Sequence, residues 1–279
     1  MARSVALYHL RRNTATSVAA AVIVLLFLLA IFGPLIVPYD PLATSMQEVL
    51  QPPSAEHWFG TDQLGRDIFS RVVVATRLDF AIAVAAVAIS ALAGISVGAM
   101  SGYLGGWLDG VTSRIVDVMM AFPLFVAAMA LVAVFGNSVQ SVVLATSIIN
   151  FPFYFRLARI EAASRREIGY VEAALINGNS SGSVIFRFLL PNSLPPVIVQ
   201  VSLNLGWAIL STSGLAFIGL GVAPPTPEWG IMIQEGASMM MSGEWWTVFF
   251  PGLALVLSVF CFSLLGDGLR DIADPRRRS

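Results

Sequence analysis

Lysine is missing from this sequence, and histidine and cysteine are scarce. All sixteen cationic residues are arginine, so the chain holds no phosphate-binding loop of the GxxxxGK type. With Cys261 as the single cysteine, no disulfide can form within the chain. The two histidines, His9 and His57, belong to no HExxH pattern or Cys/His cluster, so no metal site is predicted. The net charge of −1 gives no indication of a nucleic-acid partner.

Charged residues are also few, at 12% of the chain against 57% hydrophobic residues, a balance far more apolar than that of a soluble domain. Six segments approach or reach the roughly twenty apolar residues that cross about 30 Å of hydrocarbon. They are residues 17–37, 80–103, 118–136, 139–155, 195–222 and 247–265. The first is too long for a signal peptide and lacks a cleavage pattern, so we expect it to remain as a span. The sequence predicts an all-α integral membrane protein with six transmembrane helices.

The arginines indicate how these spans are oriented, because cytoplasmic loops carry an excess of cationic residues. With a cytoplasmic N-terminus, thirteen arginines face the cytoplasm and three face outside. The thirteen are Arg3, Arg11, Arg12, Arg114, Arg156, Arg159, Arg165, Arg166, Arg187, Arg270, Arg276, Arg277 and Arg278, and the three are Arg66, Arg71 and Arg77. Both termini are therefore predicted to be cytoplasmic.

The interiors of the predicted spans contain no Asp, Glu, Arg or His, since Asp79, Arg114, Asp117 and Asp267 fall at span ends. An ion-coupled transporter usually keeps an ionisable residue near mid-bilayer. The pattern therefore disfavours the alternative function, a secondary transporter or channel that works alone. It also offers no nucleophile, acid or ligand set for an intramembrane enzyme, so we expect no catalytic residues.

Uncharged polar residues do occur within the spans. They can form hydrogen bonds between helices, worth about 1 kcal/mol each, or they can line a hydrated path for a solute. The candidates for a translocation path are Asn150, Gln200, Asn204, Ser211 and Thr212. Both interpretations stay open from the sequence.

Span 80–103 carries Gly94, Gly98 and Gly102, which form two successive GxxxG steps. Small residues on one helix face allow a neighbouring helix to approach closely. The neighbour can belong to the same chain or to another subunit, and the sequence does not choose between them.

Two outer segments connect the spans. In the first, Thr61 is predicted to cap an amphipathic helix with an apolar face of Leu64, Ile68, Phe69, Val72 and Val73. The motif Thr61, Asp62, Gly65, Arg66 and Asp67 is expected on a surface helix with an Asp67–Arg71 ion pair, packed on another subunit or receiving a soluble protein. In the second, the aromatic residues Trp229, Trp245, Trp246 and Phe249 suit an interfacial belt. The methionines at 239–241 are expected to pack rather than to bind metal.

A soluble-looking stretch, EAALINGNSSGSVIFRFLLP at residues 172–191, stands out between the fourth and fifth spans. Gly178 is expected to end a helix in the left-handed conformation. Ser181 or Ser183 is expected to cap a second helix with the apolar face Val184, Ile185, Phe188 and Leu189, which Pro191 stops. The sequence thus predicts a helical hairpin on the cytoplasmic side. Its small residues would allow a partner to approach the backbone closely, and an ordinary loop that covers helix ends is the alternative.

This stretch resembles the EAA loop of the membrane subunits of ATP-binding-cassette (ABC) importers. The matching residues are Glu172, Ala173, Ala174, Gly178, Phe188, Leu190 and Pro191. Phe188 stands where isoleucine is usual, and Asn179 stands where alanine is common. Both departures are compatible with a helix–turn–helix.

Further motifs resemble the C-type permease subunit of dipeptide, oligopeptide and nickel importers. They are FGTDQLGRDIFSR (59–71), AFP (121–123), LAFIGLGVAPPTPEWG (215–230), FPGLAL (250–255) and LLGDGLRDIADPR (264–276). The resemblance implies the type I ABC importer transmembrane fold. It also implies an N-terminal span with an outer arm (1–77), a five-helix core with the EAA loop at 164–192 (78–270) and a cytoplasmic tail (271–279).

The same resemblance implies the function and the partners. The chain would be a non-enzymatic permease subunit in the bacterial cytoplasmic (inner) membrane that moves peptides or related solutes. Its partners would be a B-type permease, two ATPase subunits or domains, a solute-binding protein and the lipid bilayer. ATP and Mg would be bound by the ATPases, with no cofactor in this chain.

Overall fold

The computed structural model describes residues 14–273, which are helical apart from connecting segments and one isolated bridge. Five helices are long and apolar enough to cross a membrane. They are α2 (Thr14–Ile36), α3 (Ile68–Leu104), α6 (Val139–Arg165), α10 (Leu194–Phe217) and α12 (Trp246–Ala273). His9, Arg3, Arg11, Arg12, Arg276, Arg277 and Arg278 lie outside the described residues, as do most residues of the predicted tail.

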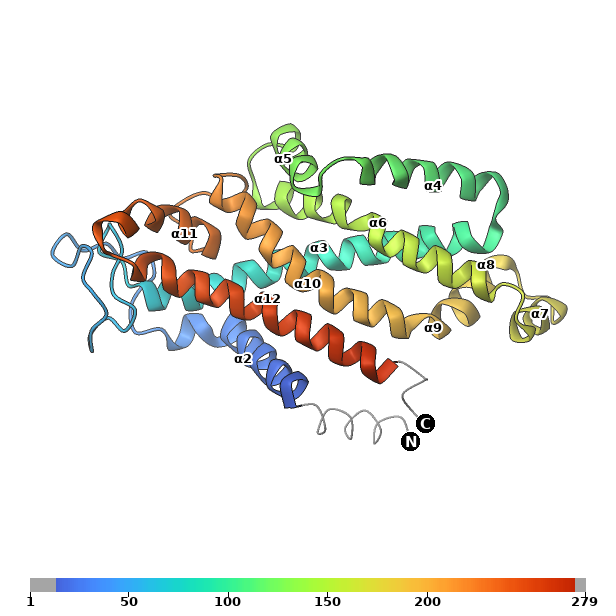
Figure 1. The fold of residues 1–279 in the computed structure, drawn as a ribbon, viewed down its shortest axis with the longest axis horizontal. Helices are drawn as coiled ribbons and strands as arrows, with labels where there is room; N and C mark the ends of the chain where they lie inside the picture. The colour runs from blue at the N-terminus through green and yellow to red at the C-terminus, as the bar shows by residue number, and fades with distance from the viewer. Residues whose placement is uncertain (1–13, 274–279) are drawn as a thin grey trace.

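The predicted continuous helix at 118–136 is wrong. In its place α4 (Gly106–Ala121) and α5 (Leu124–Phe135) meet at 96°. Between them Phe122 has an extended backbone, with φ −86° and ψ 141°, because a following proline disfavours the helical conformation. The third span of the prediction therefore corresponds to a bent pair of helices, which Figure 1 shows turned away from each other.

Other boundaries also differ from the prediction. Helix α3 begins at residue 68 rather than 80, and α6 continues through Pro152 to Arg165 rather than ending at 155. Proline is tolerated inside a membrane helix where neighbouring groups satisfy the freed carbonyl. Two helices therefore extend well beyond the apolar segments from which they were predicted.

Helices α3 and α6 form the tightest contact of the bundle. A Cβ atom added at Gly94, Gly98 or Gly102 would lie within 3 Å of the α6 backbone, at Phe151, Phe155 and Arg159 in turn. The GxxxG steps therefore serve packing within the chain, one of the two alternatives left open above. In lipid, the hydrophobic effect does little to hold helices together, because lipid tails are as apolar as the side chains. Close backbone contact of this kind compensates through van der Waals packing.

The two ends of the bundle carry different structures. Residues 38–67, here called the arm, lie at one end, and the short helices α7, α8, η1 and α9 lie at the other (Figure 1). Helix α11 (Trp229–Ala237) and the 3₁₀ turn η2 (Met239–Ser242) lie at the arm end, between α10 and α12.

The amphipathic helix predicted from Thr61 does not form. Residues Thr61 and Asp67 instead pair in an isolated antiparallel bridge, and the helix begins only at Ile68. Its N-cap is Asp67, whose carboxylate accepts a hydrogen bond from the Ser70 amide at 2.7 Å. An Asx turn at Asp62 closes the loop ahead of this cap, because its carboxylate accepts bonds from the amides of Leu64 and Arg66.

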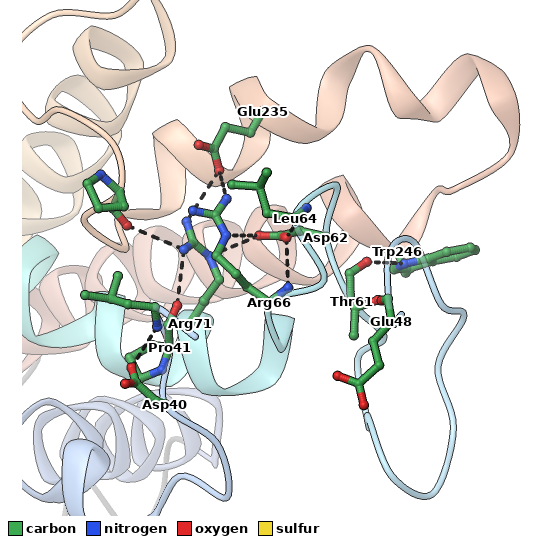
Figure 2. Close-up of polar contacts among 12 residues, drawn as sticks. Asp40, Pro41, Glu48, Thr61, Asp62, Leu64, Arg66, Arg71, Glu235 and Trp246 are labelled. Carbon is green, nitrogen blue, oxygen red and sulfur yellow. Dashed lines mark hydrogen bonds and ion pairs between the residues drawn. The ribbon is translucent and has the colours of Figure 1, made fainter. Parts of the chain in front are cut away.

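Four charged residues, three of them buried and Glu235 partly buried, fasten the arm to α11. Arg66 lies 2.6 Å from Asp62 and 2.8 Å from Glu235, while Arg71 lies 3.6 Å and 3.4 Å from the same two carboxylates. Figure 2 shows both guanidinium groups between these acids, and we call the four residues the arginine box. The expected Asp67–Arg71 pair is absent here, since Arg71 turns toward α11. Two charges of each sign balance inside a site that water hardly reaches.

In the α3–α6 contact, Gly98→Leu is expected to force the helices apart, because any side chain there meets the Phe155 carbonyl. Overpacking of this kind costs about 1–3 kcal/mol or more. The measurement is thermal unfolding of the purified chain. Gly110→Leu on α4, where no atom lies within 4 Å, is the matched control. Equal unfolding temperatures for the two variants would contradict this account.

In the arginine box, Glu235→Gln is expected to leave two buried arginines facing one carboxylate. Breaking a buried ion pair from one side costs about 3–5 kcal/mol, since a charge stays uncompensated. The lower unfolding temperature would be compared with that of Glu56→Gln, a change at an exposed arm residue. A Glu235→Gln protein as stable as this control would show that the box does not hold the arm.

Candidate functional site

The predicted hairpin is present at residues 169–192. Its first helix, α7 (Gly169–Ile176), ends in a Schellman motif at Gly178, where φ is +80°. The amide of Gly178 donates to the Leu175 carbonyl at 2.9 Å, and the amide of Asn179 donates to the Ala174 carbonyl at 3.2 Å. The Asn179 side chain adds a second bond to the same carbonyl at 2.9 Å. Asparagine at this position therefore strengthens the turn.

The second half of the hairpin differs from the prediction in two details. Ser180, rather than Ser181 or Ser183, is the N-cap, because its hydroxyl accepts the Ser183 amide at 3.3 Å. The chain then passes through α8 (Ser181–Ser183), the π-helix η1 (Val184–Leu189) and α9 (Leu190–Asn192). Pro191 does not stop this run, since it lies in the first turn of α9, where a proline needs no amide donor.

The inner face of the hairpin is anchored on the ends of α3 and α6. Val171, Ala174 and Val184 are buried together against Tyr103, Tyr170 and Phe188. Ile185 and Leu189 form a second cluster with Ala99, Ala158 and Ala162. Arg165 of α6 also donates to the Asn192 carbonyl at 3.1 Å. The hairpin is therefore a fixed extension of the two most closely packed helices.

The outer face of the hairpin is exposed and partly apolar. Glu172, Ala173, Gly178 and Pro191 are exposed, Leu190 and Phe188 are half-buried, and Ala174 is buried. Ile176 is 86% exposed and Phe186 is 49% exposed. No atom lies within 4 Å of a Cβ added at Gly178, so the glycine is required by its backbone conformation and the space beside it is open. Such a surface fits a protein partner better than water or lipid tails.

Beside the hairpin, a polar cluster ties α4 to α6. Asp109 binds Arg159 in a bidentate ion pair and accepts a bond from the Ser101 hydroxyl at 2.6 Å. An open cavity of about 420 Å³ lies next to it. Its lining residues are Ser113, Val116, Asp117, Phe155, Arg156, Arg159 and Ile160. The gap separates α4 from α6 at the hairpin end of the bundle.

The candidate path residues are largely buried within the chain. The Gln200 amide donates to the Asn204 carbonyl oxygen at 2.8 Å, and the Asn150 amide donates to the Thr146 carbonyl at 2.8 Å. Thr212 donates to the Ala208 carbonyl, and Ser211 is buried without such a bond. These contacts provide hydrogen bonds within helices. A role in solute passage stays a prediction.

Each residue of the outer motif has a defined partner at the arm end. The Trp246 indole donates to the Thr61 carbonyl at 3.1 Å, and the Thr61 hydroxyl donates to the Glu48 carbonyl (Figure 2). Asp67 accepts a bond from the buried His57 ring at 2.9 Å. Gly65 has φ +71° and lies against the Ser45 carbonyl, where a side chain would collide. With Asp62 and Arg66 in the box, the motif is an internal joint rather than an exposed surface.

The expected aromatic belt is half wrong. Trp245 and Phe249 are exposed, but Trp229 and Trp246 are buried, with their indole N–H groups bonded to backbone carbonyls. The methionines 239–241 form η2, and the described residues contain no group of three or more His, Cys, Asp or Glu that could hold a metal ion.

One pair of residues was missed from the sequence. Asp79 lies inside α3, not at a span end, and its carboxyl contacts that of Glu228, the N-cap of α11. Both residues are 1% exposed. Burial raises the pKa of Glu228 above its ordinary value. No sequence spacing connects two residues so far apart in the chain, and only the fold brings them together.

Family models match most of the chain. Residues 94–279 match the model of the binding-protein-dependent transport system inner membrane component. Residues 3–53 match that of the N-terminal transmembrane domain of oligopeptide transport permease C.

Several relatives align over nearly the full length of the chain. The dipeptide transport system permease protein DppC of Alkalihalophilus pseudofirmus is 43% identical, covering 97% of this chain and 89% of its own. The glutathione transport system permease protein GsiD of Pectobacterium atrosepticum is 39% identical, with the same coverage. DppC of Bacillus subtilis is 34% identical over 97% of this chain and 84% of its own.

The fold also matches a solved structure. A chain from inward-facing structures of the MetNI methionine ABC transporter superposes with a TM-score of 0.58, covering 72% of this chain and 96% of its own at 17% identity. That likeness establishes the type I importer fold, and the sequence relatives and family models establish descent. The chain belongs to the family of inner membrane components of binding-protein-dependent transport systems.

Proposed function

We propose that this chain is a membrane-spanning permease subunit of an ATP-driven importer for di- or oligopeptides or related small solutes. The relatives named for dipeptide and glutathione transport support this class of solute. The observation that carries the proposal is the hairpin, because it presents an exposed apolar surface on a rigid base at one end of the bundle.

The hairpin is the proposed docking site for an ATPase partner. Its contact residues would be Glu172, Ala173, Ala174, Gly178, Phe188, Leu190 and Pro191. The exposed members among them lie beside Ile176, whose side chain would lose most contact with water on docking. ATP and Mg would be bound by the partner, so this chain would contribute the mechanical connection alone.

The rigid base explains how force would reach the membrane helices. Shifting a permease from 1:99 to 99:1 between two states needs about 5.5 kcal/mol of differential interaction. A displacement of the hairpin would be transmitted to α3 and α6 through the buried cluster that contains Ala99 and Ala162. Since these two helices contact each other along their backbones, they would move as one unit.

The remaining partners follow from the same assignment. A B-type permease would complete the membrane assembly, and a solute-binding protein would deliver cargo at the arm end. This arrangement places the hairpin in the cytoplasm and the chain in the bacterial inner membrane. It agrees with the arginine distribution, since Arg156, Arg159, Arg165, Arg166 and Arg187 all lie near the hairpin.

The test is the substitution Gly178→Leu in the assembled importer. Leucine in a left-handed conformation is strained by about 1–2 kcal/mol, and its side chain would occupy the open space that a partner needs. We expect ATP-driven uptake into proteoliposomes to fall at least tenfold, with normal membrane insertion and weaker copurification of the ATPase.

Gly243→Leu is the matched control, because Gly243 also has a positive φ, of +107°, and open space around it, but lies at the arm end. Its uptake should be close to normal. Normal uptake by a correctly inserted Gly178→Leu protein would contradict docking through the hairpin. Solute transport by the chain alone, driven by an ion gradient without nucleotide, would favour the secondary transporter instead.

A further inference from the structure

The contact between Asp79 and Glu228 joins three elements at the arm end. Asp79 belongs to α3, about 16 Å along the helix from Ile68 at 1.5 Å per residue. Its carboxyl accepts a hydrogen bond from the Trp229 amide at 3.3 Å. Glu228 accepts the Ile231 amide at 2.7 Å and faces the Ser213 hydroxyl of α10. The two side chains thus bind the first turn of α11 from both sides.

Within residues 14–273, no cation compensates these two acids. Among the elements packed around them, α10 contributes Ser213 and no charged group. On α3, Arg71 is held in the arginine box and by the Pro225 carbonyl, while Arg77 is exposed. The other acid of α11, Glu235, is bound by both box arginines. The groups acting on either carboxyl are each other, backbone amides and one hydroxyl.

Two carboxyl groups in direct contact cannot both be ionised at neutral pH, because like charges at hydrogen-bond distance repel strongly. Burial adds to this effect, since it disfavours every charged form. Among the described residues, the Oε1 atom of Glu228 and the Oγ atom of Ser213 are buried without a hydrogen-bond partner. A proton on one carboxyl would satisfy its neighbour, as in the shared-proton dyads of other proteins.

We propose that Asp79 and Glu228 share one proton, and that this proton site fastens α11 to α3 and α10 at the outer end of the permease. The ligand is a proton rather than a metal ion, because the described residues around the pair add no third acid, histidine or cysteine. The inference does not depend on the peptide substrate or on the hairpin. It adds a pH-sensitive joint at the end of the bundle opposite the hairpin.

The direction of the pH effect follows from the raised pKa of Glu228. A group whose pKa is higher in the folded state contributes full stability at pH below its unfolded pKa and loses it as pH rises through the folded value. The joint is therefore expected to be most stable at acidic pH and to loosen as the pH rises through the folded-state pKa of the pair. Loosening would free α11, which carries Glu235 of the arginine box.

Infrared spectroscopy of the assembled transporter in lipid nanodiscs tests the shared proton directly. At neutral pH we expect a C=O band from a protonated carboxyl that disappears in the double variant Asp79→Asn with Glu228→Gln. The control Glu56→Gln should keep the band. If the double variant fails to assemble, Glu228→Gln alone carries the comparison, and its band is expected to shift in frequency or disappear, because Asp79 then faces an amide instead of a carboxyl. No such band in the unmodified protein, or the same band in every variant, overturns the proposal.

Thermal unfolding between pH 5 and 9 gives an independent readout. One proton per molecule predicts a fall of about 2–4 °C per pH unit over the range in which the folded pair holds a proton that the unfolded chain has lost. The neutral double variant should lack this pH-dependent fall, and the control should retain it. If sodium ions restored the stability of the unmodified protein at alkaline pH and not that of the double variant, the pair would be a cation site and the shared proton would be wrong. Failure of this test leaves the importer function untouched, since uptake is measured separately.

Discussion

The close approach of α3 and α6 is the contact on which the rest of the structure depends. Three glycines let the two backbones approach each other closely over two GxxxG steps, so that van der Waals packing holds the helices together. The arm and α11 are attached to the first third of α3, and the hairpin rests on the opposite end of α3 and on the neighbouring end of α6. Loss of this contact would therefore disturb both the arm end and the hairpin end of the bundle.

Buried charge is neutralised in two different ways at the arm end of the molecule. The arginine box balances two cations against two anions, so the four charges compensate one another without a bound proton. The neighbouring acid pair has no cation and depends on pH for its neutrality. At the hairpin end, Asp109 and Arg159 form a half-exposed pair that solvent can reach. The arm end thus contains one cluster, the arginine box, that is neutralised by ion pairs, and a second, the Asp79–Glu228 pair, that is neutralised by the proposed shared proton.

Much of the fold could be predicted from the positions of apolar segments and turn residues along the sequence. The apolar segments gave five of the helices, and the glycine in the EAA stretch gave the hairpin with its Schellman turn. Periodicity failed at residues 61–67, because Asp62 and Asp67 bond to backbone amides and hold a turn where an amphipathic pattern suggests a helix. It failed again at Phe122–Pro123, where a local backbone restriction overrides uniform hydrophobicity. The acid pair lay beyond prediction, since a contact between residues 79 and 228 depends on the three-dimensional arrangement.

The length of α3 has a consequence for what lies outside the membrane. Its 37 residues extend about 55 Å, against about 30 Å of hydrocarbon. Tilt alone would have to exceed 50° to hide that difference, which is more than membrane helices show. Part of the helix must therefore extend beyond the hydrocarbon, and the folded arm is attached to the end of the helix that begins at Ile68. In the proposed orientation, a solute-binding protein would contact the arm before it reached the lipid headgroups.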